Sequence, residues 1–305
     1  MEAELAARVG AAAVEDLRRL SGGASRETWS FDAVGADGSR QELVLQRERP
    51  GSLRPAQMGK EAAVLRAARA AGVPVPEVVT ADDTSFVVAR LAGETIPRKV
   101  LRDEAWAGAL PVLAADCGRA LAGVHAIPAN AVPGLEAVDQ VAQYREVLDL
   151  AGEAHPAFEL GFRWLEANRP SGARETVVHG DFRLGNLMIG PDGLVAVLDW
   201  ELVHVGDPLE DLGWLCVKAW RFGERPRVGG FGTVEELVGA YESASGSVVD
   251  LDALRWHETL GTLKWGIMCI MQARTHLSGA VRSVELAAIG RRVCEQEHDL
   301  LLLLP

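Results

Sequence analysis

The stretch that most limits the possible folds of this chain is residues 179–201, HGDFRLGNLMIGPDGLVAVLDWE. Two short apolar runs flank the turn sequence GPDG at 190–193, which is typical of a tight antiparallel hairpin. Such a hairpin brings Asn186, at the start of the first run, close to Asp199, just after the second, and Asp181 lies in the loop before it. Acidic and amide groups in these places must be solvated, paired or bound to a cation.

Three oxygen-bearing side chains at one end of a small hairpin have the composition of a site for a hard cation. Mg²⁺ binds through one or two carboxylates together with phosphate oxygens of a substrate. A carboxylate close to the metal but not bound to it can accept a proton from a hydroxyl. The structural alternative is that Asp181 and Asn186 merely cap turns, which both residue types favour. The spacing to Asp199 makes the site the stronger hypothesis.

The first 95 or so residues have the pattern of a small sheet with one helix packed on it. Helical spacing of apolar residues over 2–20 predicts a helix, and alternation at 28–31 and 42–47 predicts two strands joined by the turn GADGS. A second helix is predicted over 56–71, where Gly72 and Pro74 end it. Two further strands are predicted within VPEVVTADDTSFVVARL, around its Asp-Asp turn.

From Asp103 onward the pattern is mainly helical, and the hairpin region interrupts it with strands predicted at 176–178, 186–189 and 194–198. We therefore predict an α+β fold with two lobes. The first, residues 1–92, is a small antiparallel-sheet lobe, and the second, residues 93–305, is mostly helical. The change of pattern near Gly93 sets the boundary.

Composition excludes several classes of protein. The 305 residues are 48% apolar and 24% charged, which is ordinary for a soluble globular chain. Four cysteines without a CxxC pair argue against a zinc site and favour a reducing cytoplasm. We find no signal peptide and no apolar run long enough to span a membrane. The net charge of −12 disfavours a nucleic-acid partner. We expect a cytoplasmic protein without a membrane or nucleic-acid partner, and the oligomeric state stays open.

The spacing H-G-D-x4-N, then twelve residues, then D, resembles the catalytic half of the kinase-like phosphotransferases. The resemblance is closest to the aminoglycoside phosphotransferase/choline kinase branch, which acts on small molecules. Protein kinases carry H-R-D-x4-N and D-F-G, whereas here Gly180 replaces the arginine and Asp199-Trp200-Glu201 replaces D-F-G. Because the loop arginine usually pairs with an activation-loop phosphate, the substitution points away from protein substrates. Two further segments resemble the family: LSGGASRETW, its phosphate-covering loop, and GDPLEDLGWL, which follows its second metal aspartate.

The resemblance implies a bilobal protein-kinase-like fold, with ATP or GTP and Mg²⁺ between the lobes. Asp181 would orient or deprotonate the acceptor hydroxyl, and Arg183 would neutralise the moving phosphate. Asn186 and Asp199 would hold Mg²⁺, and His179 would anchor the loop. The expected nucleotide contacts come from the phosphate-covering loop, the third strand, the first-lobe helix and the hinge between the lobes: Ser21, Gly22, Gly23, Ser25, Gln46, Arg47, Glu61, Ala89 and Leu91.

One position departs from the family pattern. The strand ELVLQRERP has no lysine, and Gln46 stands where the family places the lysine that pairs with the helix acid, here Glu61. Strand alternation sends residues 46 and 47 to opposite faces. A slip of one residue would let Arg47 pair with Glu61; otherwise another cation, such as Arg26, covers the phosphates.

Several other polar and aromatic residues have a structural interpretation that competes with a functional one. We expect Asp207, before Pro208, to cap a helix, and His204 to be a satisfied or exposed histidine rather than a metal ligand. The tryptophans of the C-terminal helices are core residues by default, with a substrate wall as the alternative for Trp220 or Trp265. Lys264, within a predicted buried helix, is expected to extend its amine to the surface or to be paired.

The sequence thus predicts an enzyme that transfers the γ-phosphate of ATP or GTP to a hydroxyl of an unidentified small molecule. The absent strand lysine motivates an alternative, a catalytically silent nucleotide- or metabolite-binding protein on the same fold. A metal-dependent hydrolase would use the aspartates of the hairpin, but it leaves the glycine loop, Glu61 and the hinge unexplained.

Overall fold

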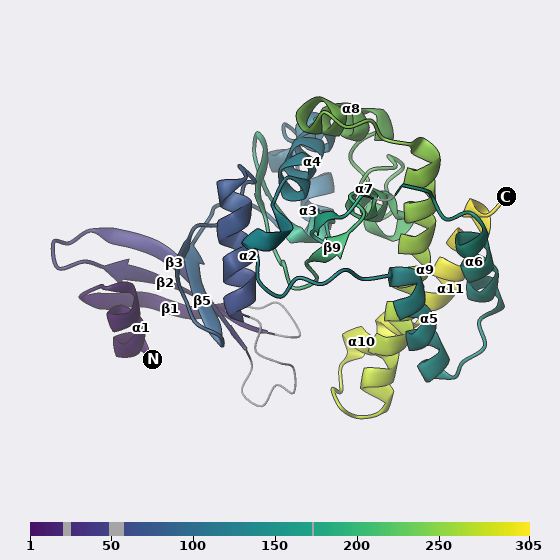
Figure 1. Ribbon diagram of the computed structural model, residues 1–305. Helices are drawn as coiled ribbons and strands as arrows, with labels where there is room; N and C mark the ends of the chain where they lie inside the picture. Colours follow the sequence, from purple (N-terminus) through teal and green to yellow (C-terminus); the bar gives the residue numbers. More distant parts are fainter. Residues whose placement is uncertain (21–25, 49–57, 173) are drawn as a thin grey trace.

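The computed structural model describes residues 1–20, 26–48, 58–172 and 174–305. A sheet with two helices forms one side of the molecule, and the remaining helices form the other (Figure 1). Within the described ranges, no helix has both the length and the apolar composition that crossing a membrane requires.

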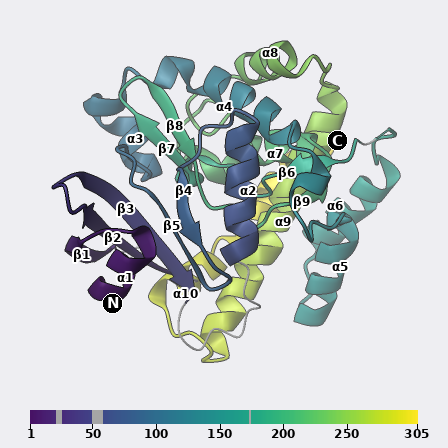
Figure 2. The same ribbon diagram turned by 60° about the vertical axis from the view of Figure 1, so that its left-hand side comes forward.

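The sheet is built from the first five strands of the chain in the order β1-β2-β3-β5-β4, and each neighbouring pair is antiparallel. The strands are β1 Ala13–Leu20, β2 Arg26–Val34, β3 Arg40–Glu48, β4 Val78–Ala81 and β5 Ser85–Ala89. Helix α2, Met58–Ala70, contacts β4 and β5 and stands between the sheet and the helical side in both views (Figures 1 and 2). The predicted hairpin, first-lobe helix and two following strands are therefore confirmed.

The helix predicted over residues 2–20 is wrong in its second half. Helix α1 spans Glu2–Val9 and ends at Gly10, whose φ of 71° is the left-handed conformation that favours glycine. The chain then forms β1, whose register with β2 shifts between Glu15 and Arg18, around the positive φ of Asp16. This bulge inserts one extra residue, so Val14 and Leu17 both pack on one apolar cluster. The resulting spacing of three imitates a helix.

The helical side is organised around one long helix, α9, Leu251–Leu277, which contacts α5, α6, α7, α10 and α11. The α-helices besides α9 are α3 Pro97–Arg102, α4 Leu110–His125, α5 Gln140–Ala151, α6 Pro156–Ala167, α7 Leu209–Cys216, α8 Val234–Ser245, α10 Val284–Gly290 and α11 Val293–Leu303. Short 3₁₀ turns lie at Glu104–Trp106, Ala129–Ala131, Leu184–Asn186 and Lys218–Arg221. The lobe boundary at residues 92 and 93 stays a prediction.

Two small ribbons interrupt the helices and carry the polar residues of the opening motif. Strands β6, Thr176–Val178, and β9, His204–Gly206, form one pair, and β7, Leu187–Gly190, and β8, Gly193–Val197, form the other. The Leu198 N–H donates to the Asn186 carbonyl at 2.8 Å, so the hairpin places Asn186 and Asp199 at the same end, as predicted. Mutual backbone bonds between Glu94 and Ile189, at 2.9 and 3.0 Å, tie the chain leaving the sheet to this hairpin.

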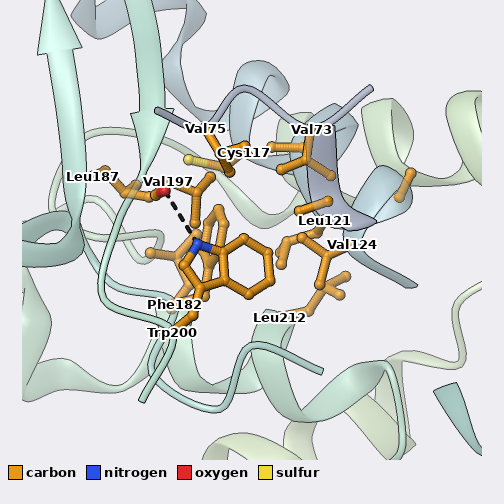
Figure 3. Packing of buried hydrophobic residues seen from close by; sticks show 14 of the residues in the cluster. Val73, Val75, Cys117, Leu121, Val124, Phe182, Leu187, Val197, Trp200 and Leu212 are labelled. Carbon is orange, nitrogen blue, oxygen red and sulfur yellow. Dashed lines mark hydrogen bonds between the residues drawn. The ribbon is translucent and has the colours of Figure 1, made fainter. Parts of the chain in front are cut away.

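Trp200 fixes the residues after the hairpin in the main apolar core. The side chain is 1% exposed, and its indole N–H donates to the Val197 carbonyl at 3.2 Å. Figure 3 shows the indole among apolar side chains of several segments, including Val73, Leu121 and Leu212. Packing in the core and this one hydrogen bond therefore hold Trp200, and with it the backbone of its neighbour Asp199.

We expect Trp200→Ala to lower the free energy of unfolding by about 3–5 kcal/mol, because it removes a large buried side chain and leaves a cavity. Urea denaturation measures the change. The matched control is Trp106→Ala, since Trp106 is only half-buried. A loss at position 200 no larger than at position 106 would contradict this role for Trp200.

Candidate active site

The loop His179-Gly180-Asp181 is held from behind by a buried carboxylate. Asp211, on α7, is fully buried and accepts the backbone N–H groups of His179 and Gly180 at 2.8 and 2.9 Å. His125 Nε2 lies 3.1 Å from the same carboxylate. Burial favours the neutral acid, but the hydrogen bond and charge of His125 and the loop donors outweigh it and hold the pKa of Asp211 below its ordinary value. The loop backbone is therefore anchored by an ionised side chain.

The ring of His179 completes this anchorage. Its Nδ1 accepts the backbone N–H of Asp181 at 3.2 Å, which makes Nε2 the donor to the Leu198 carbonyl at 3.0 Å. The ring also packs against Trp200, with centroids 4.6 Å apart. One histidine thus joins the loop to the end of β8.

Gly180 has a steric reason to be glycine. Its φ is 80°, and a Cβ at this position would lie 2.4 Å from the Leu202 carbonyl oxygen. The Gly180 carbonyl accepts a hydrogen bond from Lys264 Nζ at 3.0 Å. An arginine cannot occupy this position in the present backbone, which explains the H-G-D form of the motif.

Asp181 is surrounded by hydrogen-bond donors. Its Oδ1 accepts from Trp214 Nε1 at 2.8 Å and from Arg183 Nε at 3.0 Å, and its Oδ2 accepts from Asn186 Nδ2 at 2.6 Å. The side chain is 14% exposed. The guanidinium of Arg183 also lies over the ring of Trp220, 4.9 Å from its centroid. The structure therefore brings Asp181, Arg183 and Asn186 together, as the motif predicted.

The chemistry of Asn186 and Asp199 fits a hard cation. Because Nδ2 of Asn186 donates to the carbonyl and carboxylate of Asp181, its Oδ1 is left for other partners. Asp199 has a φ of 60°, rare for a residue other than glycine, and its side chain is 41% exposed. Among the described residues, no group of three His, Cys, Asp or Glu could hold a metal by itself. Mg²⁺ suits such a sparse oxygen set, since it takes further ligands from phosphate and water.

Arg26, at the start of β2, is the cation that pairs with Glu61. Its guanidinium lies 2.7 Å from Glu61, 3.4 Å from Glu201 and 3.9 Å from Asp199. Burial opposes the charge of Arg26, but Glu61 and the other two carboxylates outweigh it and raise the pKa of the guanidinium. The Glu61 side chain is 5% exposed, and burial raises its pKa despite the attraction of Arg26. One cation thus joins α2 of the sheet side to the residues after β8.

The alternative in which a slip of one residue pairs Arg47 with Glu61 is not what the structure shows. Arg47 instead lies 2.6 Å from Glu27 on the adjacent strand, and its guanidinium is 5.9 Å from the ring centroid of Trp29. The regular register of β2 and β3 shows no slip that would turn Arg47 toward α2. Of the two cations considered from the sequence, Arg26 is the one that meets Glu61.

The remaining predicted nucleotide contacts keep the status of predictions. Gln46 lies opposite Thr28 on β2 and Phe86 on β5. The N–H of Ala89 donates to the Glu77 carbonyl at 2.9 Å, and Leu91 follows the end of β5. The predictions for the glycine loop lie outside the described residues: Ser21, Gly22, Gly23 and Ser25.

The residues given a structural interpretation make structural contacts. Asp207 lies one position before Pro208, the N-cap of α7, so the predicted cap position is wrong, but its carboxylate accepts the Leu209 N–H at 2.8 Å. His204 bonds to Glu210 at 3.0 Å. Lys264 is paired with the Gly180 carbonyl rather than with an acid, and its amine lies 4.6 Å from the ring centroid of Trp214. Trp220 and Trp265 pack in one buried aromatic cluster with Trp214.

Sequence reasoning missed the roles of Asp211 and Trp214. Both lie in GDPLEDLGWL, which was used only for its resemblance to the family. A signal was present, because an aspartate in an otherwise apolar helical segment must find partners when it is buried. The identity of those partners depends on tertiary structure.

Comparison with known proteins finds a matching family model and several similar proteins. The profile of the family described as "Phosphotransferase enzyme family", APH, matches residues 16–257. Acyl-CoA dehydrogenase family member 10 of Mus musculus is 29% identical over 210 residues, which make up 63% of this chain and 20% of that protein. Acyl-CoA dehydrogenase family member 11 of Homo sapiens is 29% identical over 229 residues, 66% of this chain and 29% of that protein. The chain therefore spans less than a third of these relatives.

Solved structures resemble the chain over nearly its whole length. A candidate aminoglycoside phosphotransferase from Ralstonia eutropha has a TM-score of 0.74 and 19% identity, covering 94% of this chain and 92% of that one. A choline/ethanolamine kinase family protein from Mesorhizobium loti has a TM-score of 0.65 and 22% identity, with 94% and 87% covered. APH(2″)-IIa, solved with streptomycin and ATP, has a TM-score of 0.61 and 19% identity, with 88% of each chain covered. At these identities the likeness concerns the fold, and it confirms the predicted fold class.

Proposed function

Because the chain belongs to the phosphotransferase enzyme family, we propose that it transfers the terminal phosphate of ATP or GTP to a hydroxyl group of a small molecule. The observation that carries this proposal is the joint presence of two networks beside one another. Asp181, Arg183 and Asn186 form the first, and Arg26, Glu61 and Asp199 form the second. Phosphate transfer requires a base, ligands for a metal ion and a cation that faces the phosphates. In this proposal Asp181 is the base, and Asn186 and Asp199 are the metal ligands. Arg26 is the cation.

In the proposed reaction the acceptor oxygen forms a bond to the terminal phosphorus while the bond from that phosphorus to the bridging oxygen of the nucleoside diphosphate breaks. Asp181 orients the hydroxyl and takes its proton. Arg183 contacts Asp181 through Nε, so the other guanidinium nitrogens are available to the transferred phosphate. The residues supply positioning and charge compensation rather than covalent chemistry.

Asn186 and Asp199 would hold Mg²⁺ in this reaction, through the amide Oδ1 and the exposed carboxylate described above. The ion would neutralise phosphate charge when bound. Arg26, fixed by Glu61, would add the charge that the family obtains from its strand lysine. The proposal leaves open the acceptor, the choice between ATP and GTP, and the oligomeric state. The cytoplasmic location stays a prediction.

The silent-binding alternative was motivated by the absence of a lysine at position 46. The pairing of Arg26 with Glu61 supplies a cation by another route and removes that motive. The hydrolase alternative gains nothing from the structure, since it gives no role to Arg26 or to its buried partner.

Calorimetry and a phosphate-transfer screen test the proposal together. We expect Mg·ATP or Mg·GTP to bind, slow release of the diphosphate without acceptor, and transfer of labelled phosphate to at least one hydroxylated metabolite.

Asp199→Asn should reduce the Mg²⁺-dependent part of nucleotide binding, because it removes one of two proposed ligands. Chelation with EDTA is the matched control. Binding without turnover across the panel would favour the silent protein, and cleavage of phosphate esters without nucleotide would favour the hydrolase.

A further inference from the structure

Trp214 reaches the proposed base from outside the loop that carries it. Its indole Nε1 donates to Asp181 Oδ1 at 2.8 Å. The other donors to this carboxylate, Arg183 and Asn186, come from the loop itself and from the turn that follows it. Among the described residues that donate to the Asp181 carboxylate, Trp214 is the one from a different element, helix α7.

One face of α7 makes both of its contacts with the catalytic loop. Asp211 and Trp214 are three positions apart in the sequence, which places them on the same side of a helix. Asp211 binds the backbone of the loop at residues 179 and 180, and Trp214 binds the side chain of the next residue. The helix thus fixes the direction of the loop and the orientation of the Asp181 carboxylate together.

The Trp214 ring is locked in place by its surroundings. It is 3% exposed, and a Cβ on Gly261 would lie 3.2 Å from its Cε3, so the glycine lets α9 approach the ring closely. The amine of Lys264 lies over the ring while it binds the Gly180 carbonyl. Trp220 packs against the other members of the cluster, with its ring centroid 5.1 Å from that of Trp214. Because the ring is fixed, the position of its N–H group, which donates to Asp181, is fixed as well.

Not every indole of the cluster donates in this way. Within the described part of the chain, the buried Nε1 atoms of Trp220 and Trp265 have no hydrogen-bond partner. Packing alone therefore does not account for the N–H contact of Trp214. The donor of this contact belongs to α7 and is held by the aromatic cluster, so the contact does not depend on the position of Arg183.

We propose that Trp214 is a positioning residue for phosphate transfer. It holds Asp181 through Oδ1 while Asn186 holds Oδ2, so the carboxylate keeps its orientation while the other guanidinium nitrogens of Arg183 engage the transferred phosphate. The inference rests on the proposed function, because it concerns the base of that reaction. It assigns Trp214 a role in the rate of transfer and none in nucleotide binding.

Trp214→Phe tests the role, because it keeps a large ring and removes the N–H. With Mg·ATP alone as the probe, we expect the kcat for diphosphate release to fall at least tenfold while KM for ATP stays within about twofold. The matched control is Trp256→Phe. Trp256, on α9, is buried like Trp214. Its N–H donates to the Leu165 carbonyl at 2.9 Å, away from the loop. The Trp256→Phe variant loses the same kind of hydrogen bond, and its kcat should stay within threefold of the wild-type value.

A spectroscopic arm examines the contact without depending on turnover or on a Trp214 variant. In protein labelled with ¹⁵N at its indoles, Asp181→Ala should move the Trp214 N–H signal by more than that of Trp256. This comparison decides the matter if Trp214→Phe does not fold. An unmoved Trp214 signal, an unchanged kcat in Trp214→Phe, or an equal loss in Trp256→Phe would each overturn the inference. Failure of the proposed function looks different, because the wild-type chain itself would then release no diphosphate.

Discussion

Asp181→Asn is expected to lower the kcat of phosphate transfer by about 10²–10⁴-fold, the usual range for loss of a general base. Asparagine keeps the size of the side chain but cannot take up the hydroxyl proton. Nucleotide binding should change by less than about threefold, because the proposed binding groups, Arg26, Asn186 and Asp199, remain. Steady-state kinetics gives the first quantity and calorimetry the second. Asp181→Ala should show the same loss of turnover.

The same hairpin offers a matched control. Asp192 is an exposed aspartate in the turn between β7 and β8, at the end away from Asp181. Asp192→Asn makes the same chemical change and should leave kcat within about twofold. If Asp181→Asn retained wild-type turnover, proton transfer to this carboxylate could not be part of the reaction.

Arg26→Met is expected to weaken Mg·ATP binding by about 10–100-fold, which corresponds to the loss of one charged hydrogen bond. The same change should reduce the free energy of unfolding by about 3–5 kcal/mol, since it leaves the buried Glu61 without its counter-charge. Adding Glu61→Gln should recover much of the stability, because it removes the unpaired charge. It should not recover the affinity for ATP. Denaturation and calorimetry of the single and double variants separate the two effects.

Arg47→Met is the control for this experiment, because Arg47 lies on the adjacent strand and pairs with Glu27 instead. It should leave ATP affinity nearly unchanged. The reverse result, with position 47 sensitive and position 26 not, would show that the cation has been assigned to the wrong residue.

The pH dependence of stability provides a second measurement on Arg26→Met. Burial raises the pKa of Glu61 above its ordinary value of 4.5, and Arg26 lowers it in part. A raised folded-state pKa gives stability that is present at low pH and lost as the pH rises through it. Without Arg26 the pKa rises further, so the stability of the variant should fall over a wider range above pH 4.5 than that of the wild type.

The local parts of this structure could be predicted from sequence because their signals are local. The turn at 190–193 joins β7 and β8, and their antiparallel pairing, which shifts by one residue between Met188 and Ile189, places Asn186 and Asp199 at one end. The glycine after α2 and the Asp-Asp turn before β5 similarly mark the ends of their elements. Spacing within one hairpin therefore carried most of the candidate site.

Contacts between distant segments could not be predicted in this way. Arg26, at the start of β2, meets Glu61 on α2, and nothing in the spacing of residues 26 and 61 indicates this contact. The indole of Trp214 reaches Asp181 only because glycines let α7 and α9 approach each other closely. The wrong helix prediction at residues 10–20 has the opposite cause, since the local bulge at Asp16 gives the apolar residues a helical spacing.

Gly180 also constrains how this loop could change in evolution. Any side chain at that position would collide with the peptide group of Leu202, in the connection that leads into β9. A mutation from glycine to arginine would therefore be harmful until that connection had first moved, which makes the order of mutations matter. A change from H-G-D to H-R-D in this architecture therefore requires an earlier change at Leu202, away from the histidine-aspartate motif.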